Sequence, residues 1–269
     1  MTEVDWGRLK AHELRALAAQ NAVVILPVAA IEQHGPHLPV MTDALLGEEV
    51  ARRAARIASK QRPTLVTPVV WHGLSEHHLP FGGTLTLDHE TFYSVLKCLV
   101  HSLRRNGFRD ILISNSHGGN IAALQCAAER LFQELDTTVV VATYVNESRS
   151  EIASILADQP HIMHACEGET SMMLALLPEL VDSSDLASLA VARGQGFSQA
   201  GKGSYRWRNF AHMTGNGVSG NPANATAGKG KAILDAAATG LANLITDNET
   251  WAPARDTRSK DTCGVPFLD

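Results

Sequence analysis

Two short segments of the sequence carry residues whose types and spacing suit metal chemistry. The segment EQHGPHLP (32–39) places Glu32 and His34 directly after an apolar run, and Asp43 follows at the start of a helical pattern. The segment SNSHGGN places His117 after another apolar run, beside two glycines that let the backbone approach a ligand closely. This mixture of oxygen and nitrogen ligands suits Zn²⁺, Mn²⁺ or Fe²⁺. The four residues are therefore candidate metal ligands.

The spacing of Glu32 and His34 is compatible with two metal ions. Residues two apart in extended backbone point to the same side, so each could serve one ion while Asp43 bridges both. A water held between two such ions loses its proton far more readily than bulk water. The alternative is that Glu32 is a solvated loop acid and His34 a turn residue, but the joint placement of four candidates favours the metal site. His37 is expected to support the site or the fold.

A third segment, HACEGETSMML, adds protonatable groups at the start of an apolar helix. Glu167 and Glu169 lie before or within its first turn, where the helix dipole favours carboxylates, so a purely structural role is the favoured explanation when they are taken alone. His164 lies three residues before Glu167 and could act as a general acid or base, since imidazole titrates near neutral pH.

Alternating strand and helix patterns must position these residues. Apolar runs predict strands at 22–28, 64–71, 110–116 and 137–145, and helical spacing predicts helices near 8–19, 44–59, 88–105, 121–135, 167–178 and 228–247. This alternation predicts an α/β fold with a mainly parallel sheet and helices on both faces, in a single domain over 1–269. Ligands of such sheets bind at the carboxyl ends of the strands, where the candidate residues lie.

Composition excludes several classes of partner. The chain has 269 residues, 45% hydrophobic and 19% charged, with a formal net charge of −5 and no basic run, so nucleic acid is not expected. No apolar run approaches the roughly 20 residues that span a bilayer, and the first residues lack the apolar core of a signal peptide. Four widely spaced cysteines without a C-x-x-C pair suit a reducing compartment. We expect a cytoplasmic protein without a membrane partner.

Taken together, EQHGPHLPVMTD, SNSHGGN and HACEGETSMML resemble the creatininase family of metal-dependent hydrolases, in this order and separation. The segments SEHHLPFGGTLTLD and GNPANATAGKGKAI extend the resemblance to about residues 5–245. The resemblance implies a three-layer α/β/α domain, two divalent metal ions per chain and a homohexamer. It also implies that Glu32, His34, Asp43 and His117 bind metal, with Asp43 bridging, and that His164 is the general acid or base.

The sequence departs from creatininase itself in the loop that contains His117. Creatininase has a motif like GHYEN there, whose Glu is a further ligand, and this chain has Gly119 in that place. We hypothesise that Glu167 supplies the fifth ligand instead and that Glu169 orients His164 or a bound water. Tryptophans that surround creatinine in true creatininases also have no counterpart near Val145 and Pro160, so creatinine is not the first choice of substrate.

These features predict a hydrolase of a small amide or cyclic amide. A metal-bridging hydroxide would attack the carbonyl, and His164 would give a proton to the leaving nitrogen. His78, Thr84 and the loop 193–220, including Trp207 and Arg208, are candidate contacts for a small-molecule substrate. The alternatives are a peptidase or a ring-opening carbon–carbon hydrolase of the same family, or a metal- or sugar-binding module without turnover.

Overall fold

The fold is built around a short parallel sheet. The computed structural model describes residues 3–190, 204–259 and 264. Within them, four strands lie in the order β2-β1-β3-β4 and every neighbouring pair is parallel. The strands are β1 (Val23–Val28), β2 (Thr64–Val66), β3 (Ile111–Asn115) and β4 (Val140–Thr143). The predicted parallel α/β sheet is confirmed.

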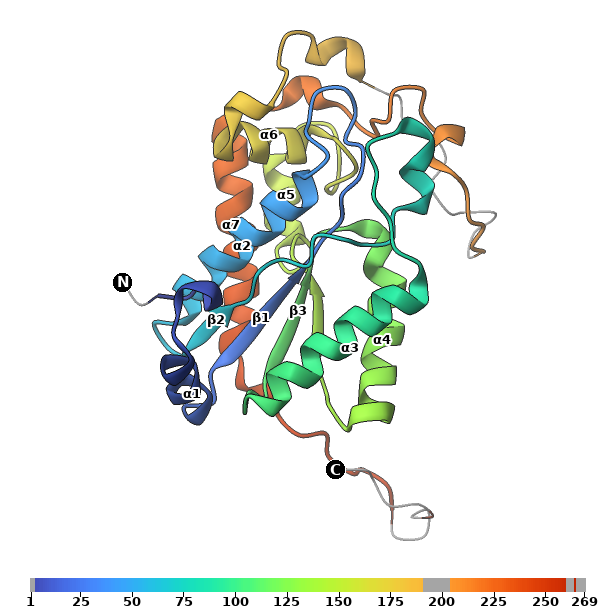
Figure 1. The fold of residues 1–269 in the computed structure, drawn as a ribbon. Coiled ribbons are helices and arrows are strands. Elements are labelled where there is room, and N and C mark those ends of the chain that lie inside the picture. Colours follow the sequence, from blue (N-terminus) through green and yellow to red (C-terminus); the bar gives the residue numbers. More distant parts are fainter. Residues whose placement is uncertain (1–2, 191–203, 260–263, 265–269) are drawn as a thin grey trace.

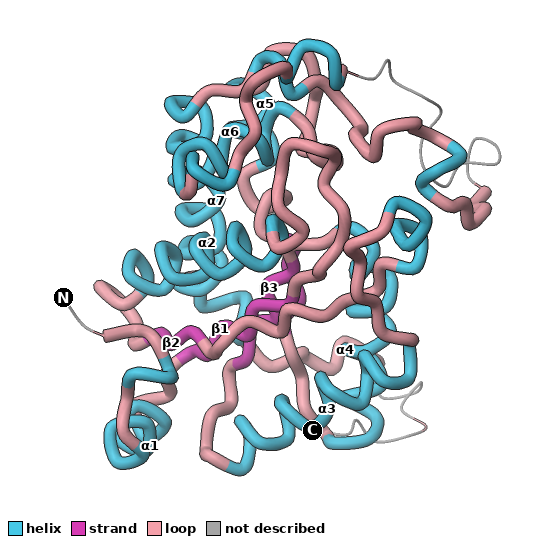
Figure 2. The backbone as a smooth tube through the Cα atoms, turned by 45° about the horizontal axis from the view of Figure 1, so that its top comes forward, coloured by secondary structure: helices cyan, strands magenta, loops and turns pink. Residues whose placement is uncertain are grey.

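Helices cover both faces of this sheet (Figure 1). They are α1 (Ala11–Ala19), α2 (Thr42–Ala58), α3 (His89–Arg105), α4 (Ile121–Leu135), α5 (Arg149–Ile155), α6 (Glu167–Leu176) and α7 (Ala227–Thr246). Figure 2 shows α2 and α7 on one side of the strands and α3 and α4 on the other. The side chains of β1 alternate accordingly: Val23 and Ile25 pack with α2, α6 and α7, whereas Val24 and Leu26 pack with α3 and α4. This is the expected three-layer α/β/α arrangement.

The strand order determines where a ligand can bind. The chain moves from β1 to β2 on one side and then places β3 on the other side of β1, so the connections leave β1 and β3 in opposite directions. Such a switch point opens a crevice at the carboxyl ends of the two strands. Glu32 follows β1 and His117 follows β3, and Asp43 lies in the first turn of α2. The topology therefore brings the loop after β1, the loop after β3 and the first turn of α2 to the same edge of the sheet.

Three elements differ from the sequence-based expectations, and one of them is β4, which covers only Val140–Thr143 of the predicted 137–145. Strand β2 ends at Val66 instead of continuing to Trp71, because Pro68 has no N–H for a ladder, and only a single parallel bridge between Val28 and Val70 follows. Helix α5 was not predicted, since seven residues are too few to show a clear helical period. None of the described helices has the length and apolar character needed to cross a membrane.

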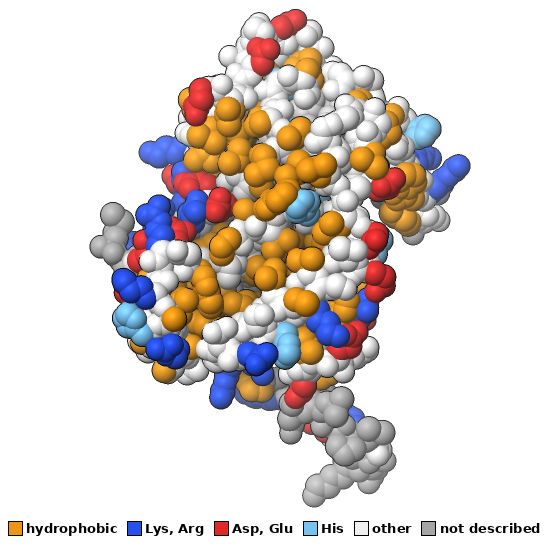
Figure 3. All heavy atoms as spheres, viewed as in Figure 1, with side chains coloured by type: hydrophobic (Ala, Val, Ile, Leu, Met, Phe, Trp, Pro, Cys, Tyr) orange, Lys and Arg blue, Asp and Glu red, His pale blue; other side chains and the backbone are white. Residues whose placement is uncertain are grey.

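Figure 3 shows apolar side chains gathered over the middle of one face, with most charged groups nearer its edges. The exposed large apolar residues of the chain include four on the segments that follow β1 and β2, namely Val40, Trp71, Leu79 and Leu85. Apolar surface of this kind often marks a contact with another protein surface.

Candidate metal centre

Four predicted ligands meet in one buried cluster. His34 Nε2 lies 3.3 Å from Asp43 Oδ1, and His117 Nδ1 lies 3.1 Å from Asp43 Oδ2. His117 Nε2 lies 3.3 Å from Glu32 Oε2. All four side chains are at most 4% exposed. The two oxygens of Asp43 thus face two different imidazoles, as a bridging carboxylate would.

Backbone carbonyls orient both imidazoles toward Asp43. His34 Nδ1 donates to Glu32 O at 3.1 Å, and His117 Nε2 donates to Leu74 O at 3.1 Å. In the neutral rings this leaves His34 Nε2 and His117 Nδ1 as lone-pair nitrogens that point at carboxylate oxygens. Lone pairs facing lone pairs in a buried site are stabilised by a cation between them, which is a proton in the metal-free protein and would be a metal ion in the loaded protein.

The residues fit divalent metal ions. Within the described part of the chain, His34 Nε2 and Asp43 Oδ2 are buried without a hydrogen-bond partner, which is unusual for polar atoms in a protein interior. Three groups of side chains could each hold an ion, because the ligand atoms within each group lie within 4.8 Å of one another. The groups are Glu32/His34/His164, Glu32/His77/His117 and His34/Asp43/Glu169. The last two groups share no residue. Nitrogen and oxygen donors in this mixture suit Zn²⁺, Mn²⁺ or Fe²⁺.

The charges within the cluster shift the pKa values of its histidines and of Asp43. Burial lowers the pKa of His34, but the charge and hydrogen bonding of Asp43 outweigh it and raise the pKa to about 10. Burial likewise lowers the pKa of His117, and Glu32 and Asp43 raise it above its usual value. Burial raises the pKa of Asp43, yet His34 and His117 bring it below its usual range. Metal-free protein therefore holds protons here, and metal binding releases them.

Glu169, not Glu167, reaches the cluster, and this corrects the hypothesis of a fifth ligand at Glu167. Both carboxylate oxygens of Glu167 accept from Ala157 N at 3.0 Å, and its Oε1 lies 2.5 Å from Lys229 Nζ. Glu169 faces His34 and Asp43, and burial raises its pKa to about 7. Residues two apart on a helix point roughly 200° apart, so only one of the two glutamates can face the site.

Glu167→Ala is expected to retain the metal content of the wild type and to lower stability by about 2–4 kcal/mol, because it leaves the Lys229 ammonium and Ala157 N–H without their buried partner. Elemental analysis and urea unfolding measure the two effects. Glu179→Ala, at an exposed site, is the control. Loss of metal with unchanged stability would instead indicate that Glu167 is a metal ligand.

His77 joins the cluster and was not predicted as a site residue. It follows Glu76 in a short 3-10 helix, and its ring lies 5.8 Å from that of His117, nearly parallel to it. Burial lowers the pKa of His77 to about 3, so the ring is neutral and can offer a lone pair. The two adjacent histidines of SEHH were the available signal, but only His78 was singled out.

Gly119 lies against these imidazoles so closely that no side chain fits. A Cβ there would lie 2.4 Å from His117 Nε2 and from Leu74 O, and 2.9 Å from His77 Cε1. His77 therefore fills the space beside the position where creatininase carries the glutamate of GHYEN.

Gly119→Ala is expected to break the hydrogen bond between His117 and Leu74, and to lower metal affinity by about 10- to 100-fold, the usual cost of losing a ligand's supporting contact. Metal titration measures the change. Gly118→Ala is the matched control, because a Cβ at Gly118 meets nothing within 4 Å. Equal losses in both variants would contradict the packing argument.

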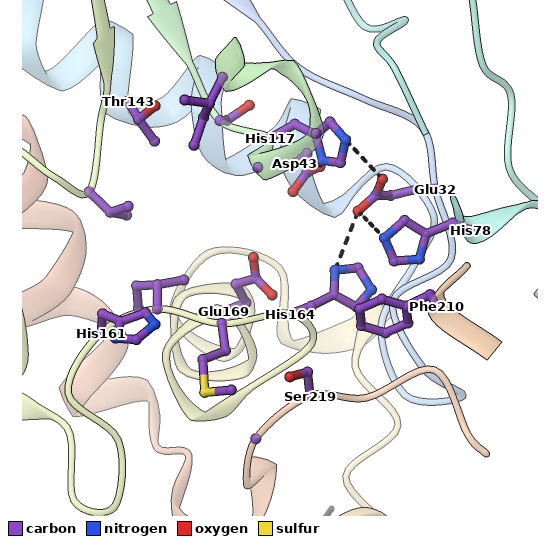
Figure 4. A pocket seen from close by; sticks show the side chains of 18 of the residues that line it. Glu32, Asp43, His78, His117, Thr143, His161, His164, Glu169, Phe210 and Ser219 are labelled. Atoms are coloured by element: carbon purple, nitrogen blue, oxygen red, sulfur yellow. Dashed lines mark ion pairs between the residues drawn. The ribbon is translucent and has the colours of Figure 1, made fainter. Parts of the chain in front are cut away.

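His164 and His78 hold Glu32 from the other side. His164 Nδ1 lies 3.3 Å and His78 Nε2 lies 3.2 Å from Glu32 Oε1, as the dashed lines in Figure 4 mark. His164 Nε2 donates to Gln33 O at 2.8 Å, which leaves Nδ1 as its acceptor. Gln33 Nε2 donates to His78 Nδ1 at 2.7 Å, so His78 presents its N–H to Glu32. Burial and the neighbouring His34 lower the pKa of His164 well below its usual value, so the ring is neutral at pH 7.

The predicted substrate contacts divide into two groups. His78 lines the cavity next to the cluster, whereas Thr84 is not among its lining residues and accepts a hydrogen bond from Gln33 N at 3.2 Å. Thr84 therefore supports the backbone of the EQHG segment, and its assignment as a substrate contact is corrected. Trp207 is 51% exposed, and Trp207 and Arg208 do not line the cavity. Residues 193–203 of the predicted loop lie outside the described residues.

A cavity of about 590 Å³ opens over the cluster, within the usual range for small-molecule sites. Ile121, Ile152, Phe210 and Met213 give it apolar sides. Phe210 was not predicted: its ring lies 4.5 Å from that of His78 and 4.9 Å from that of His164, and it limits the access of water to both. The cavity can hold an organic molecule with one end at the cluster.

His37 supports the site and gives it a pH dependence. Its Nε2 contacts Thr170 Oγ1 at 2.9 Å on α6, and burial lowers its pKa to about 4. Because the unfolded chain binds this proton near pH 6.5, the stability that neutral His37 contributes is complete above pH 6.5 and is lost as the pH falls toward about 4. Urea unfolding of the metal-free protein should therefore show the advantage of wild type over His37→Gln shrinking by roughly 1–3 kcal/mol across this window. His12→Gln, at an exposed site, should show no such trend, and parallel curves for His37→Gln would contradict the assignment.

The fold and the cluster define an α/β protein with a candidate metal-binding site at the carboxyl ends of its strands, and known proteins share this fold. The family model described as "Creatininase: Creatinine amidohydrolase" matches residues 7–245. A creatinine amidohydrolase of Pseudomonas putida is 33% identical over 200 residues, which cover 67% of this chain and 72% of that protein. A mycofactocin precursor peptide peptidase of Mycolicibacterium smegmatis is 28% identical over 252 residues, 90% of each chain.

Solved structures agree with these relatives. The chain superposes on a crystal structure of creatinine amidohydrolase with a TM-score of 0.78 at 27% identity, over 94% of this chain and 100% of that one. A manganese form of creatininase gives a TM-score of 0.75 at 28% identity with the same coverage. The chain belongs to the creatininase family of amidohydrolases, as its motifs predicted.

Proposed function

We propose that the protein is a metal-dependent hydrolase that cleaves a C–N bond in a small amide or cyclic amide. The observation that carries this proposal is the buried cluster in which His34 Nε2 and Asp43 Oδ2 lack hydrogen-bond partners among the described residues, at the floor of a cavity that also contains neutral His164. Polar atoms arranged in this way suit metal ions and a reacting carbonyl.

Two divalent ions, Zn²⁺, Mn²⁺ or Fe²⁺, are the proposed cofactors. His34, Asp43 and Glu169 would hold one, and Glu32, His77 and His117 would hold the other, with Asp43 between them. When bound, such ions polarise a carbonyl group and lower the pKa of coordinated water. Solved creatininase structures described as manganese and zinc–zinc forms support this choice.

The chain's own residues then handle the proton. His164 Nδ1 accepts a proton from the attacking water and returns it to the leaving nitrogen, so that hydrolysis yields an acid and an amine. Gln33 O fixes the ring through Nε2, and the N–H of His78 keeps Glu32 Oε1 in place. Phe210 packs on both rings and keeps solvent from them.

A short peptide is the second candidate substrate. The cavity of about 590 Å³ has room beyond a single small ring, and the mycobacterial relative that matches 90% of this chain is a peptide peptidase. Ring opening by carbon–carbon hydrolysis is the third candidate reaction, and a 3-dehydro-scyllo-inosose hydrolase of Thermotoga maritima that is 28% identical over 187 residues shows that relatives also act on cyclic sugar derivatives. The homohexamer is a prediction from family likeness, and the exposed apolar face supports self-association. Cytoplasmic location and a single domain over 1–269 also stay predictions.

Chelation followed by metal return tests the proposal. Chelator-treated protein is assayed on a panel of cyclic ureas, lactams, formamides and short peptides, before and after addition of Mn²⁺ or Zn²⁺. Activity that disappears and returns with metal is expected. Mg²⁺, which prefers an all-oxygen site, is the matched control ion. Binding of metal without turnover across the panel would favour the binding module instead.

A further inference from the structure

One wall of the cavity is built from the segment that follows β4 and differs in charge from the floor. Asn146, Arg149 and His161 line it. Figure 4 shows His161 across the cavity from Glu32 and His78, so this wall faces the cluster of candidate metal ligands. Among the described residues that line the cavity, Arg149 is the only lysine or arginine. The floor therefore carries carboxylates and imidazoles, and the segment after β4 adds a permanent cation.

Helix α5 directs this cation toward the cavity. Arg149 and Ile152 both line it, and residues three apart lie on the same face of a helix. Ile152 is buried, so this face is anchored by packing while the long side chain of Arg149 extends from it. Arg149 itself is exposed, so its backbone is anchored in the fold while its guanidinium is accessible to a ligand.

Arg149 has no carboxylate partner within ion-pair distance in the described part of the chain. Some other arginines of the chain form ion pairs, Arg52 with Asp5, Arg53 with Glu49 and Arg62 with Asp110, and what distinguishes Arg149 among the described residues is that it is unpaired and lines the cavity. A guanidinium presents a planar fork of N–H donors that matches a carboxylate bidentately. A cation left available beside a ligand cavity is suited to an anionic group of the ligand.

We propose that the substrate carries a carboxylate that Arg149 binds, while its scissile amide lies at the cluster. The substrate class is an anionic amide, linear or cyclic, with apolar carbon atoms between its two polar ends that contact Ile121, Phe210 and Met213. Asn146 offers a further hydrogen bond at the same wall. This inference rests on the proposed hydrolase function, because it assumes that the carbonyl binds at the metal centre.

Monohydroxamates of straight-chain dicarboxylic acids test it by binding alone. The hydroxamate end chelates metal, the free carboxylate probes Arg149, and a matched series carries a terminal carboxamide in place of the carboxylate. Calorimetry is done on metal-loaded protein with chains of increasing length. At the best length the acid is expected to bind about 10- to 100-fold more tightly than its carboxamide, the range for one charge-assisted contact.

Variants assign this preference to one side chain. Arg149→Met is expected to abolish it while leaving the affinity for the carboxamide and the metal content unchanged, which also shows that the variant is folded. Arg149→Lys should keep part of it, and Arg105→Met, at an exposed site on α3, should keep all of it. Equal affinity for acid and carboxamide at every length, or a preference that survives Arg149→Met, would overturn the inference and leave the hydrolase proposal intact. Failure of both series to bind loaded protein would overturn the two together.

Discussion

Asp43→Asn is expected to lose bound metal and to reduce hydrolysis by at least about 10³-fold. Asp43 faces both lone-pair imidazoles, at 3.3 Å from His34 and 3.1 Å from His117, and no other described carboxylate contacts both. An amide has the same shape but supplies only one oxygen and no charge, so it cannot neutralise two cations. Elemental analysis of the purified variant and a turnover assay on the best amide substrate measure the two losses.

Glu48→Gln is the matched control for Asp43→Asn. Glu48 lies on the same helix and is 26% exposed, with Arg52 as its partner at 2.8 Å. Partly exposed pairs of this type contribute about 0–1 kcal/mol, so the control should retain both metal and activity. Full metal content in Asp43→Asn would show that Asp43 does not bridge.

His164→Gln is expected to lower kcat by about 10²- to 10⁴-fold without loss of metal. Its Nδ1 is the neutral acceptor beside Glu32, and glutamine can imitate the hydrogen bond to Gln33 O but cannot carry a proton between water and nitrogen. The loss should be greatest for amides with strongly basic leaving amines and small for activated anilides, whose nitrogen leaves with little help. Steady-state kinetics on a series of leaving groups measures this dependence.

His212→Gln provides the matched control, because His212 is an exposed histidine that does not line the cavity. A His164→Gln variant that loses the same factor on every substrate would act by positioning rather than by proton transfer. A variant that loses metal would place His164 among the ligands, beside Glu32 and His34.

The fold was predictable where side-chain periodicity is strong. Helix α3 begins after Asp88, whose carboxylate accepts from Thr91 N at 2.7 Å, and it ends before Gly107 at φ 92°, close to the predicted range 88–105. Strands β1 and β3 were apparent as buried apolar runs. The length of β2 was not, because Pro68 interrupts a run that remains apolar.

The site residues that lie within short sequence motifs were predictable, and those whose role depends on contacts with distant parts of the chain were not. Glu32, His34, Asp43 and His117 come from segments whose register the sheet determines. The choice between Glu167 and Glu169 depends on the rotation of α6 and on Lys229, which is distant in sequence and pairs with Glu167. His77 could not be separated from His78, since adjacent positions in a short 3-10 helix follow no long period.

The proposed ligands of the cluster are contributed by segments that extend from Glu32 on the loop after β1 to Glu169 on α6. The proposed metal ions would act as a clamp between these parts of the chain, which are distant in sequence and otherwise meet through packing and the polar contacts of the cluster. Any ion that binds the folded chain and not the unfolded chain adds RT ln(1 + [M]/Kd) to stability. The concentration of available metal then affects the amount of folded protein in the cell as well as the rate of turnover. Substitutions that weaken the clamp should lower cellular abundance along with turnover, so activity should be compared per folded molecule.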